Sequence, residues 1–187
     1  MKKGFTLIEL LIVIAVLGIL AVAVLSAINP IEQINRSRDT GSRSDAEQLL
    51  GGVDRYYASA GYYPWQSSGS STNASLTPLT EITTKTQTFG TDGVAMLTEL
   101  SSGGSAELKD SFVTRITSTG YNNLYIYNRG TPGDSTYVCF NPKSSAFMKE
   151  ATGRCEGTNG TIPTDLGNAT VCGVTVGGKV VNMSCLP

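Results

Sequence analysis

Glu9 is the one charged residue in a long apolar segment near the start of the chain. The residues from Leu10 to Ile31 carry no charge, and a helix of that length spans about 33 Å, close to the thickness of a bilayer's hydrocarbon core. A carboxylate in such surroundings costs several kcal/mol unless it is neutralised or paired. We therefore expect the Glu9 carboxylate to have a partner that pairs with it or neutralises it.

Side chains for other chemistry are scarce. The chain has no histidine, its carboxylates are scattered, and it contains neither a phosphate-binding loop nor a dinucleotide fingerprint. The net charge of −1 gives no basic face for nucleic acid. Three arginines form a local basic cluster interleaved with Asp39 and Asp45, which we interpret as a solvated helix face or a subunit contact: Arg36, Arg38 and Arg43. We predict a protein that is not an enzyme and has no cofactor and no metal site.

The four cysteines all lie in the last third of the chain, at Cys139, Cys155, Cys172 and Cys185. None forms a CxxC pair, so zinc ligation is not indicated. Their even number and wide spacing predict two disulfides formed in an oxidising compartment. Each would contribute on the order of 3 kcal/mol to stability. Three connectivities are possible, and the sequence does not choose among them.

The apolar segment also predicts the topology of the chain. Lys2 and Lys3 are the only charges before it, which favours a cytoplasmic N-terminus and sends the rest of the chain outward. A cleaved secretory signal is one alternative, with Ala21–Ala23 as small residues for cleavage. A simple signal anchor is another, but it leaves Glu9 without an explanation.

The stretch Gly4-Phe5-Thr6-Leu7-Ile8-Glu9 resembles the processing motif of type IV pilins and type II secretion pseudopilins. The resemblance implies that a prepilin peptidase cuts between Gly4 and Phe5 and that Phe5 is then N-methylated. In a bundle of staggered helices, the amine of Phe5 could pair with Glu9 of a neighbouring subunit. Such a pair fixes the register of the helices, because a slipped neighbour leaves both charges unpaired.

Gly18 and Pro30 are the two positions where the long helix is expected to be irregular. Proline removes one helix hydrogen bond and crowds the preceding turn, so we expect a kink near Pro30. Glycine allows close packing of membrane helices. The resemblance to type IV pilins further implies local melting between these two positions when the helix leaves the membrane.

The rest of the chain is predicted as an amphipathic helix followed by a head. The helix should end near Gly61, and a short helix is expected at 94–100 within a Ser-, Thr- and Gly-rich connection. Strands are expected at 123–128 and 135–140, with a turn at 141–144 leading into a further β segment at 146–148. Gly177-Gly178 predicts a hairpin between 174–176 and 179–181. That register places Cys172 opposite Met183, so a Cys172–Cys185 bond would need a bulge.

The predicted fold class is α+β: a long N-terminal helix, kinked near Pro30, whose outer half packs against a C-terminal antiparallel sheet. The expected division is a leader (1–4), a membrane and filament-core helix (5–31), an amphipathic helix (32–60), a loop-rich connection (61–120) and a sheet region with the disulfides (121–187).

The resemblance implies a structural subunit of a type IV pilus. Its implied partners are further copies of itself, other pilins, the prepilin peptidase and methyltransferase, and indirectly an inner-membrane platform protein and an assembly ATPase. The subunit would wait in the inner membrane and then enter an extracellular pilus or a periplasmic filament. A pseudopilin of a type II secretion system and a minor tip pilin with a binding role are the alternatives.

Overall fold

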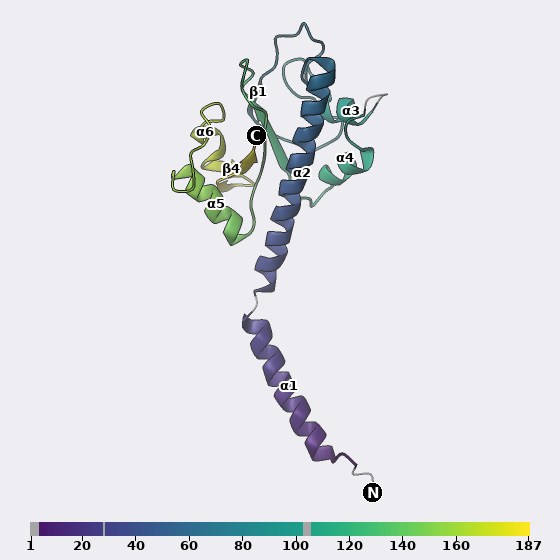
Figure 1. Cartoon of the computed structure of the whole chain (residues 1–187), viewed down its shortest axis with the longest axis vertical. Coiled ribbons are helices and arrows are strands. Elements are labelled where there is room, and N and C mark those ends of the chain that lie inside the picture. Colours follow the sequence, from purple (N-terminus) through teal and green to yellow (C-terminus); the bar gives the residue numbers. More distant parts are fainter. Residues whose placement is uncertain (1–3, 28, 103–105) are drawn as a thin grey trace.

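A computed structural model describes residues 4–27, 29–102 and 106–187. The predictions that concern Lys2, Lys3 and the leader before Gly4 lie outside these residues. Figure 1 shows a head built around one long helix, with a second helix, α1, extending away from it as a stalk. The pilin-like α+β layout predicted from the sequence is confirmed.

Two successive helices run from the stalk into the head, α1 (Leu7–Ala27) and α2 (Pro30–Ala60). Asn29 is extended, and its side-chain oxygen accepts a hydrogen bond from the Glu32 amide at 3.3 Å. Pro30 occupies the first position of α2, where its missing N–H is not needed. The kink expected at Pro30 therefore takes the form of a break between two helices, with the proline opening the second one.

α2 ends where the sequence predicts. Gly61 adopts the left-handed conformation with φ of 78°, and its amide donates to the Tyr57 carbonyl at 2.8 Å. A glycine has no Cβ to clash in this conformation, which makes it the usual residue for ending a helix. The upper half of α2 buries an apolar stripe in the head: Ala46, Leu49, Leu50 and Val53.

The main sheet has four antiparallel strands in the order β1-β2-β3-β6. Their bounds are β1 Leu76–Glu81, β2 Leu124–Asn128, β3 Tyr137–Phe140 and β6 Ser184–Leu186. Every residue of β2 and β3 is buried, because one face packs on α2 and the other is covered by the C-terminal region. The core between α2 and the sheet holds Trp65, the one tryptophan, which is fully buried.

The described part of the head also contains four shorter helices: α3 (Met96–Ser101), α4 (Asp110–Ile116), α5 (Ser145–Cys155) and α6 (Asn168–Val171). The helix expected at 94–100 is confirmed as α3. The β segment expected at 146–148 is wrong, because these residues lie inside α5. β1 and α4 were not predicted, and both lie in the connection (61–120) that was expected to be loop-rich.

The predicted hairpin is present as β4 (Val174–Val176) and β5 (Lys179–Val181), with Val174 opposite Val181. Gly177 and Gly178 have φ of 57° and 77°, the left-handed values that a tight two-residue turn requires. Both predicted disulfides form, as Cys139–Cys185 and Cys155–Cys172. A Cys172–Cys185 bond is therefore wrong: Cys185 leaves the hairpin and pairs directly opposite Cys139 in β6 and β3.

Candidate assembly site

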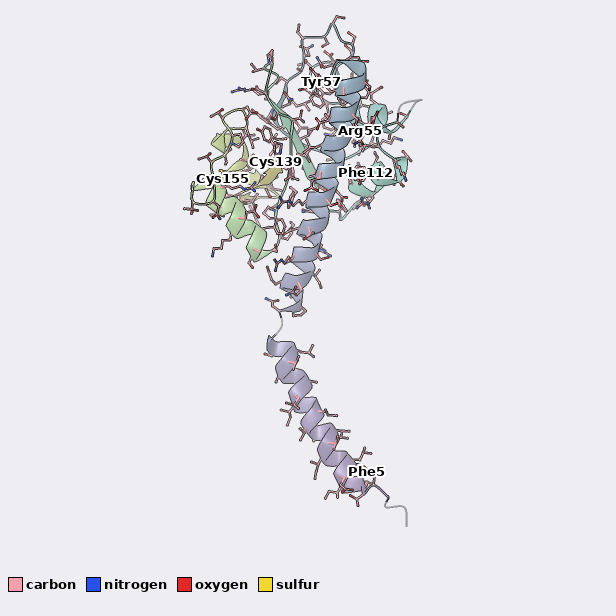
Figure 2. All side chains as sticks on the ribbon, in the orientation of Figure 1. Phe5, Arg55, Tyr57, Phe112, Cys139 and Cys155 are labelled. Atoms are coloured by element: carbon pink, nitrogen blue, oxygen red, sulfur yellow. A yellow bond between two sulfur atoms is a disulfide. The ribbon has the colours of Figure 1, made fainter. Side chains whose placement is uncertain are left out.

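The candidate site lies at the start of α1, at the end of the stalk farthest from the head, where Figure 2 labels Phe5. Phe5 is 82% exposed. Gly4 before it is also exposed, and a Cβ added there would meet nothing within 4 Å. Gly4 and Phe5 are thus both exposed in the single chain, and cleavage between them stays a prediction.

Glu9 is not left without a partner in the single chain. The Thr6 amide donates to its Oε2 atom at 2.9 Å, and the Thr6 hydroxyl donates to the same atom at 2.7 Å. The Glu9 amide donates in return to the Thr6 hydroxyl at 3.3 Å. This reciprocal arrangement is a capping box, which satisfies backbone N–H groups that the first helical turn leaves unpaired.

The sequence reasoning missed the role of Thr6. The signal was present, because Thr6-Leu7-Ile8-Glu9 has the spacing of a capping box immediately before an apolar run. The structure brings Glu9 together with Thr6 inside one chain. Pairing of Glu9 with the Phe5 amine involves a second chain and a cut N-terminus, so it stays a prediction.

α1 itself is apolar on every side. The stretch Leu7–Ser26 has a mean hydropathy of 3.1, with no part of it buried in the head. Length and composition make it able to cross a membrane. Gly18 lies in the middle of the continuous helix with open space around it. The melting expected between Gly18 and Pro30 stays a prediction.

α2 is joined to the head by two carboxylates near its start. Asp39 is fully buried and accepts hydrogen bonds from the Lys143 amide at 2.9 Å and the Ser144 amide at 2.7 Å. Glu32 accepts from the Ser145 amide at 2.9 Å and the Ser145 hydroxyl at 2.7 Å. Hydrogen bonds from Ser145 lower the pKa of the Glu32 carboxyl. These bonds fix the first turn of α5 against the lower part of α2.

A further feature of the described ranges is the placement of the side chains that can hold metal ions. Within residues 4–27, 29–102 and 106–187, no three His, Cys, Asp or Glu side chains are grouped to hold a metal ion. All four cysteines are in disulfides. What the arrangement offers is an apolar helix that requires an apolar environment, and an acidic group at its tip.

The comparisons with known proteins agree with this description. Residues 1–25 match the model of the prokaryotic N-terminal methylation motif. This match agrees with the motif that the first residues of the chain indicated.

A fimbrial protein, EcpC of Eikenella corrodens, is 34% identical over 102 residues. The match covers 54% of this chain and 65% of that relative's length. No solved structure matches the chain. Together with the layout of the fold, these matches support a type IV pilin-like subunit, and they do not distinguish a pilus subunit from a pseudopilin.

Proposed function

We propose that this protein is a structural subunit of a type IV pilus, which polymerises through α1 into an extracellular filament. The observation that carries the proposal is the state of α1: it bears the methylation motif, it is apolar all round, and its span Leu7–Ser26 has no contact with its own head. A helix of that kind needs lipid or equally apolar neighbouring helices around it. A filament core of packed α1 helices supplies the second environment after the membrane supplies the first.

Processing would remove residues 1–4 and leave Phe5 as a methylated N-terminus. The high exposure of Gly4 and Phe5 supports this step, since a peptidase needs access to the bond between them. The cut creates an α-amino group that is protonated near neutral pH, because its pKa is about 7.7–8.0. That positive charge then lies four residues from Glu9 in the same chain and is available to a neighbour.

Glu9 would receive the Phe5 amine of an adjacent subunit. Both hydrogen bonds from Thr6 end on Oε2 of Glu9, so the neighbour's amine can approach Oε1 while the capping box stays intact. The pair sets the axial register of the subunits, because any other stagger leaves two charges unpaired in an apolar core. Thr6 would then hold the carboxylate in place for this contact.

Before assembly the subunit would span the inner membrane with its N-terminus in the cytoplasm and its disulfide-bonded head outside. Extraction into the filament would use the cytoplasmic ATPase and the membrane platform protein that such systems contain. The break before Pro30 and the unpacked Gly18 would let α1 change its path. Local melting between these two positions is tested by amide exchange in the assembled filament.

Mass spectrometry of the mature N-terminus tests the processing step. We expect a chain that begins with methylated Phe5. A chain cut after Ala23 would instead restore the secretory-signal interpretation and refute the proposal.

The assembly step is tested with Glu9→Leu and Thr6→Val, each with wild-type processing verified first. We expect Glu9→Leu to abolish filaments, because the Phe5 amine of each subunit would be buried without a partner. Thr6→Val removes the two hydrogen bonds that the Thr6 hydroxyl makes with Glu9 and keeps the one from the Thr6 amide, so it should lower filament yield less. Normal yield and unaltered helical symmetry for Glu9→Leu would contradict the proposed pair.

Deletion of the gene separates the two kinds of filament. Loss of long extracellular fibres supports the pilus assignment. Loss of protein secretion with fibres intact would replace it with the pseudopilin assignment. A very low copy number in sheared fibres would point to a minor tip subunit.

A further inference from the structure

The side of the head nearest to α1, called the lower rim below, contains an open cleft with a volume of about 690 Å³. The cleft is separate from the assembly site at the start of α1. It lies between the start of α2's buried half, the loop before β2 and the segment after β3. Its lining includes Arg38 from α2, Lys143 from the segment after β3, and the amides Asn122 and Asn141. The cleft is thus polar and carries two long cationic side chains at its edge.

Both cations are available to an external anion. Arg38 and Lys143 are exposed, and neither is in a salt bridge within the part of the chain that the structure describes. The nearby carboxylates are already engaged: Asp39 is buried under the amides of residues 143 and 144, and Asp45 is buried against Arg115. A third carboxylate, Glu81, accepts a hydrogen bond from Asn123 of the lining. The charged residues of the lining itself are Arg38, Arg115 and Lys143, and of these only Arg115 is in an ion pair among the described residues.

The position of the cleft relative to α1 indicates which anion it would meet. The Lys143 amide is bonded to Asp39, so Lys143 lies at the same level of α2 as Arg38. Arg38 is twelve residues past Ser26, the end of the apolar span, which is about 18 Å at the helical rise per residue and slightly more because Asn29 is extended. The headgroup layer occupies about 5–8 Å of that distance. Long cationic side chains and a Debye length of about 8 Å cover the remainder.

We propose that this cleft docks the head on the anionic phospholipid headgroups of the bilayer that holds α1 before assembly. The proposal rests on the proposed function, since it requires α1 to be embedded in a membrane. Figure 1 shows that α2 changes direction relative to α1 at the break between them, and that the lower rim is the part of the head nearest to α1 and so to the bilayer. Docking holds the head at a fixed height and orientation above the membrane while the subunit waits for assembly.

Lys109 provides a matched control. It is also exposed and is in no salt bridge among the described residues. Its neighbour Leu108 packs against Gly52 of α2, fourteen residues beyond Arg38, so Lys109 lies about 21 Å farther from the bilayer. At more than two Debye lengths, its charge should make no difference to lipid docking.

The test uses the full chain in nanodiscs of phosphatidylcholine alone or of phosphatidylcholine mixed with phosphatidylglycerol, with hydrogen exchange as the readout. We expect the amides of 120–123 and 141–144 to exchange more slowly in the anionic discs. Arg38→Gln and Lys143→Gln should each reduce that protection about fivefold, and Arg38→Lys should retain most of it. Lys109→Gln should leave it unchanged, and high salt should abolish it.

Equal protection in neutral and anionic discs would overturn the docking proposal, as would protection that appears only in assembled filaments, which would assign the cleft to a second copy of the chain. Competition by soluble glycerophosphate without any effect of the bilayer's charge would also overturn it. Insertion into the discs is measured separately by flotation. A chain that does not insert refutes the membrane helix itself, whereas an inserted chain with no dependence on lipid charge refutes only the docking.

Discussion

Among the ion pairs in the described part of the head, the pair between Asp45 of α2 and Arg115 of α4 has the most buried carboxylate. The two guanidinium nitrogens of Arg115 donate to the two carboxylate oxygens at 3.0 and 2.8 Å. The Asp45 side chain is 4% exposed and that of Arg115 is 50% exposed. Burial raises the pKa of Asp45, and the bonds from Arg115 oppose that rise. The hydrogen bonds from Arg115 therefore stabilise the charged form of the buried Asp45 carboxylate.

Removal of Arg115 alone should therefore be more harmful than removal of the whole pair. Arg115→Met leaves a buried carboxylate without its partner, and we expect a loss of about 3 kcal/mol in the free energy of unfolding. Asp45→Asn combined with Arg115→Met should recover much of that loss. Urea unfolding followed by the fluorescence of buried Trp65 measures both. An equal loss in the single and double variants would show that packing, rather than the unpaired charge, is responsible.

Glu32 gives the junction between α2 and α5 a defined response to acid. Its pKa is lowered in the folded chain by the Ser145 hydrogen bonds. A lowered folded pKa means that the stabilisation is complete above the ordinary glutamate pKa of about 4.3 and is lost as the pH falls through the lower folded value. We expect the wild-type advantage over Glu32→Gln to shrink below pH ~4 in parallel thermal melts. A pH-independent difference between the two chains would contradict this.

At the scale of elements, two glycines of α2 provide a direct comparison. A Cβ at Gly41 would meet nothing within 4 Å, whereas a Cβ at Gly52 would lie 2.7 Å from a Leu108 methyl group. Alanine is favoured over glycine in a helix by about 1 kcal/mol.

We therefore expect Gly41→Ala to stabilise the head by about 0.5–1 kcal/mol and Gly52→Ala to destabilise it by about 1–3 kcal/mol through overpacking. Urea midpoints of the two variants measured side by side give the sign of each effect. A stabilising Gly52→Ala would mean that Leu108 can move aside without cost.

Local patterns predicted the elements whose causes are local. The end of α2 follows from Gly61, and the hairpin follows from Gly177-Gly178 between two β-branched runs. α5 was mistaken for a β segment, because its start depends on Asp39 and Glu32, more than a hundred residues earlier in the chain. Ser144 as its N-cap was the local sign that could have revealed it.

For the candidate site and its surroundings too, the features with a local cause could be predicted from the sequence and the others could not. Glu9 stood out because a charge in an apolar run is anomalous on its own, and the Thr6 capping box was readable from its spacing. The pairing of the cysteines was not readable, since Cys139 meets Cys185 only because β6 returns to lie beside β3. The cleft at Arg38 and Lys143 likewise exists only once distant segments are folded together.

At the scale of the whole molecule, the stalk and the head depend on different environments. α1 has no partner in its own head and draws its stability from lipid or from other helices. The head is stabilised by its own hydrophobic core and by two disulfides. The cysteines of Cys139–Cys185 are 46 residues apart in the sequence, and those of Cys155–Cys172 are 17 residues apart. Cys139–Cys185 ties the last strand into the centre of the sheet, and Cys155–Cys172 ties the end of α5 to α6.

The two disulfides should differ in both their contribution and their accessibility. In the chain-entropy model, loss of Cys139–Cys185 by paired alanine substitution costs about 4 kcal/mol, and loss of Cys155–Cys172 costs about 3 kcal/mol. Cys139 and Cys185 are buried in the sheet, whereas Cys155 and Cys172 are partly exposed. A mild reductant followed by alkylation and mass spectrometry should therefore label Cys155 and Cys172 first, because exchange requires access of the attacking thiolate. Simultaneous labelling of all four would mean that the head opens as one cooperative unit before either bond is reduced.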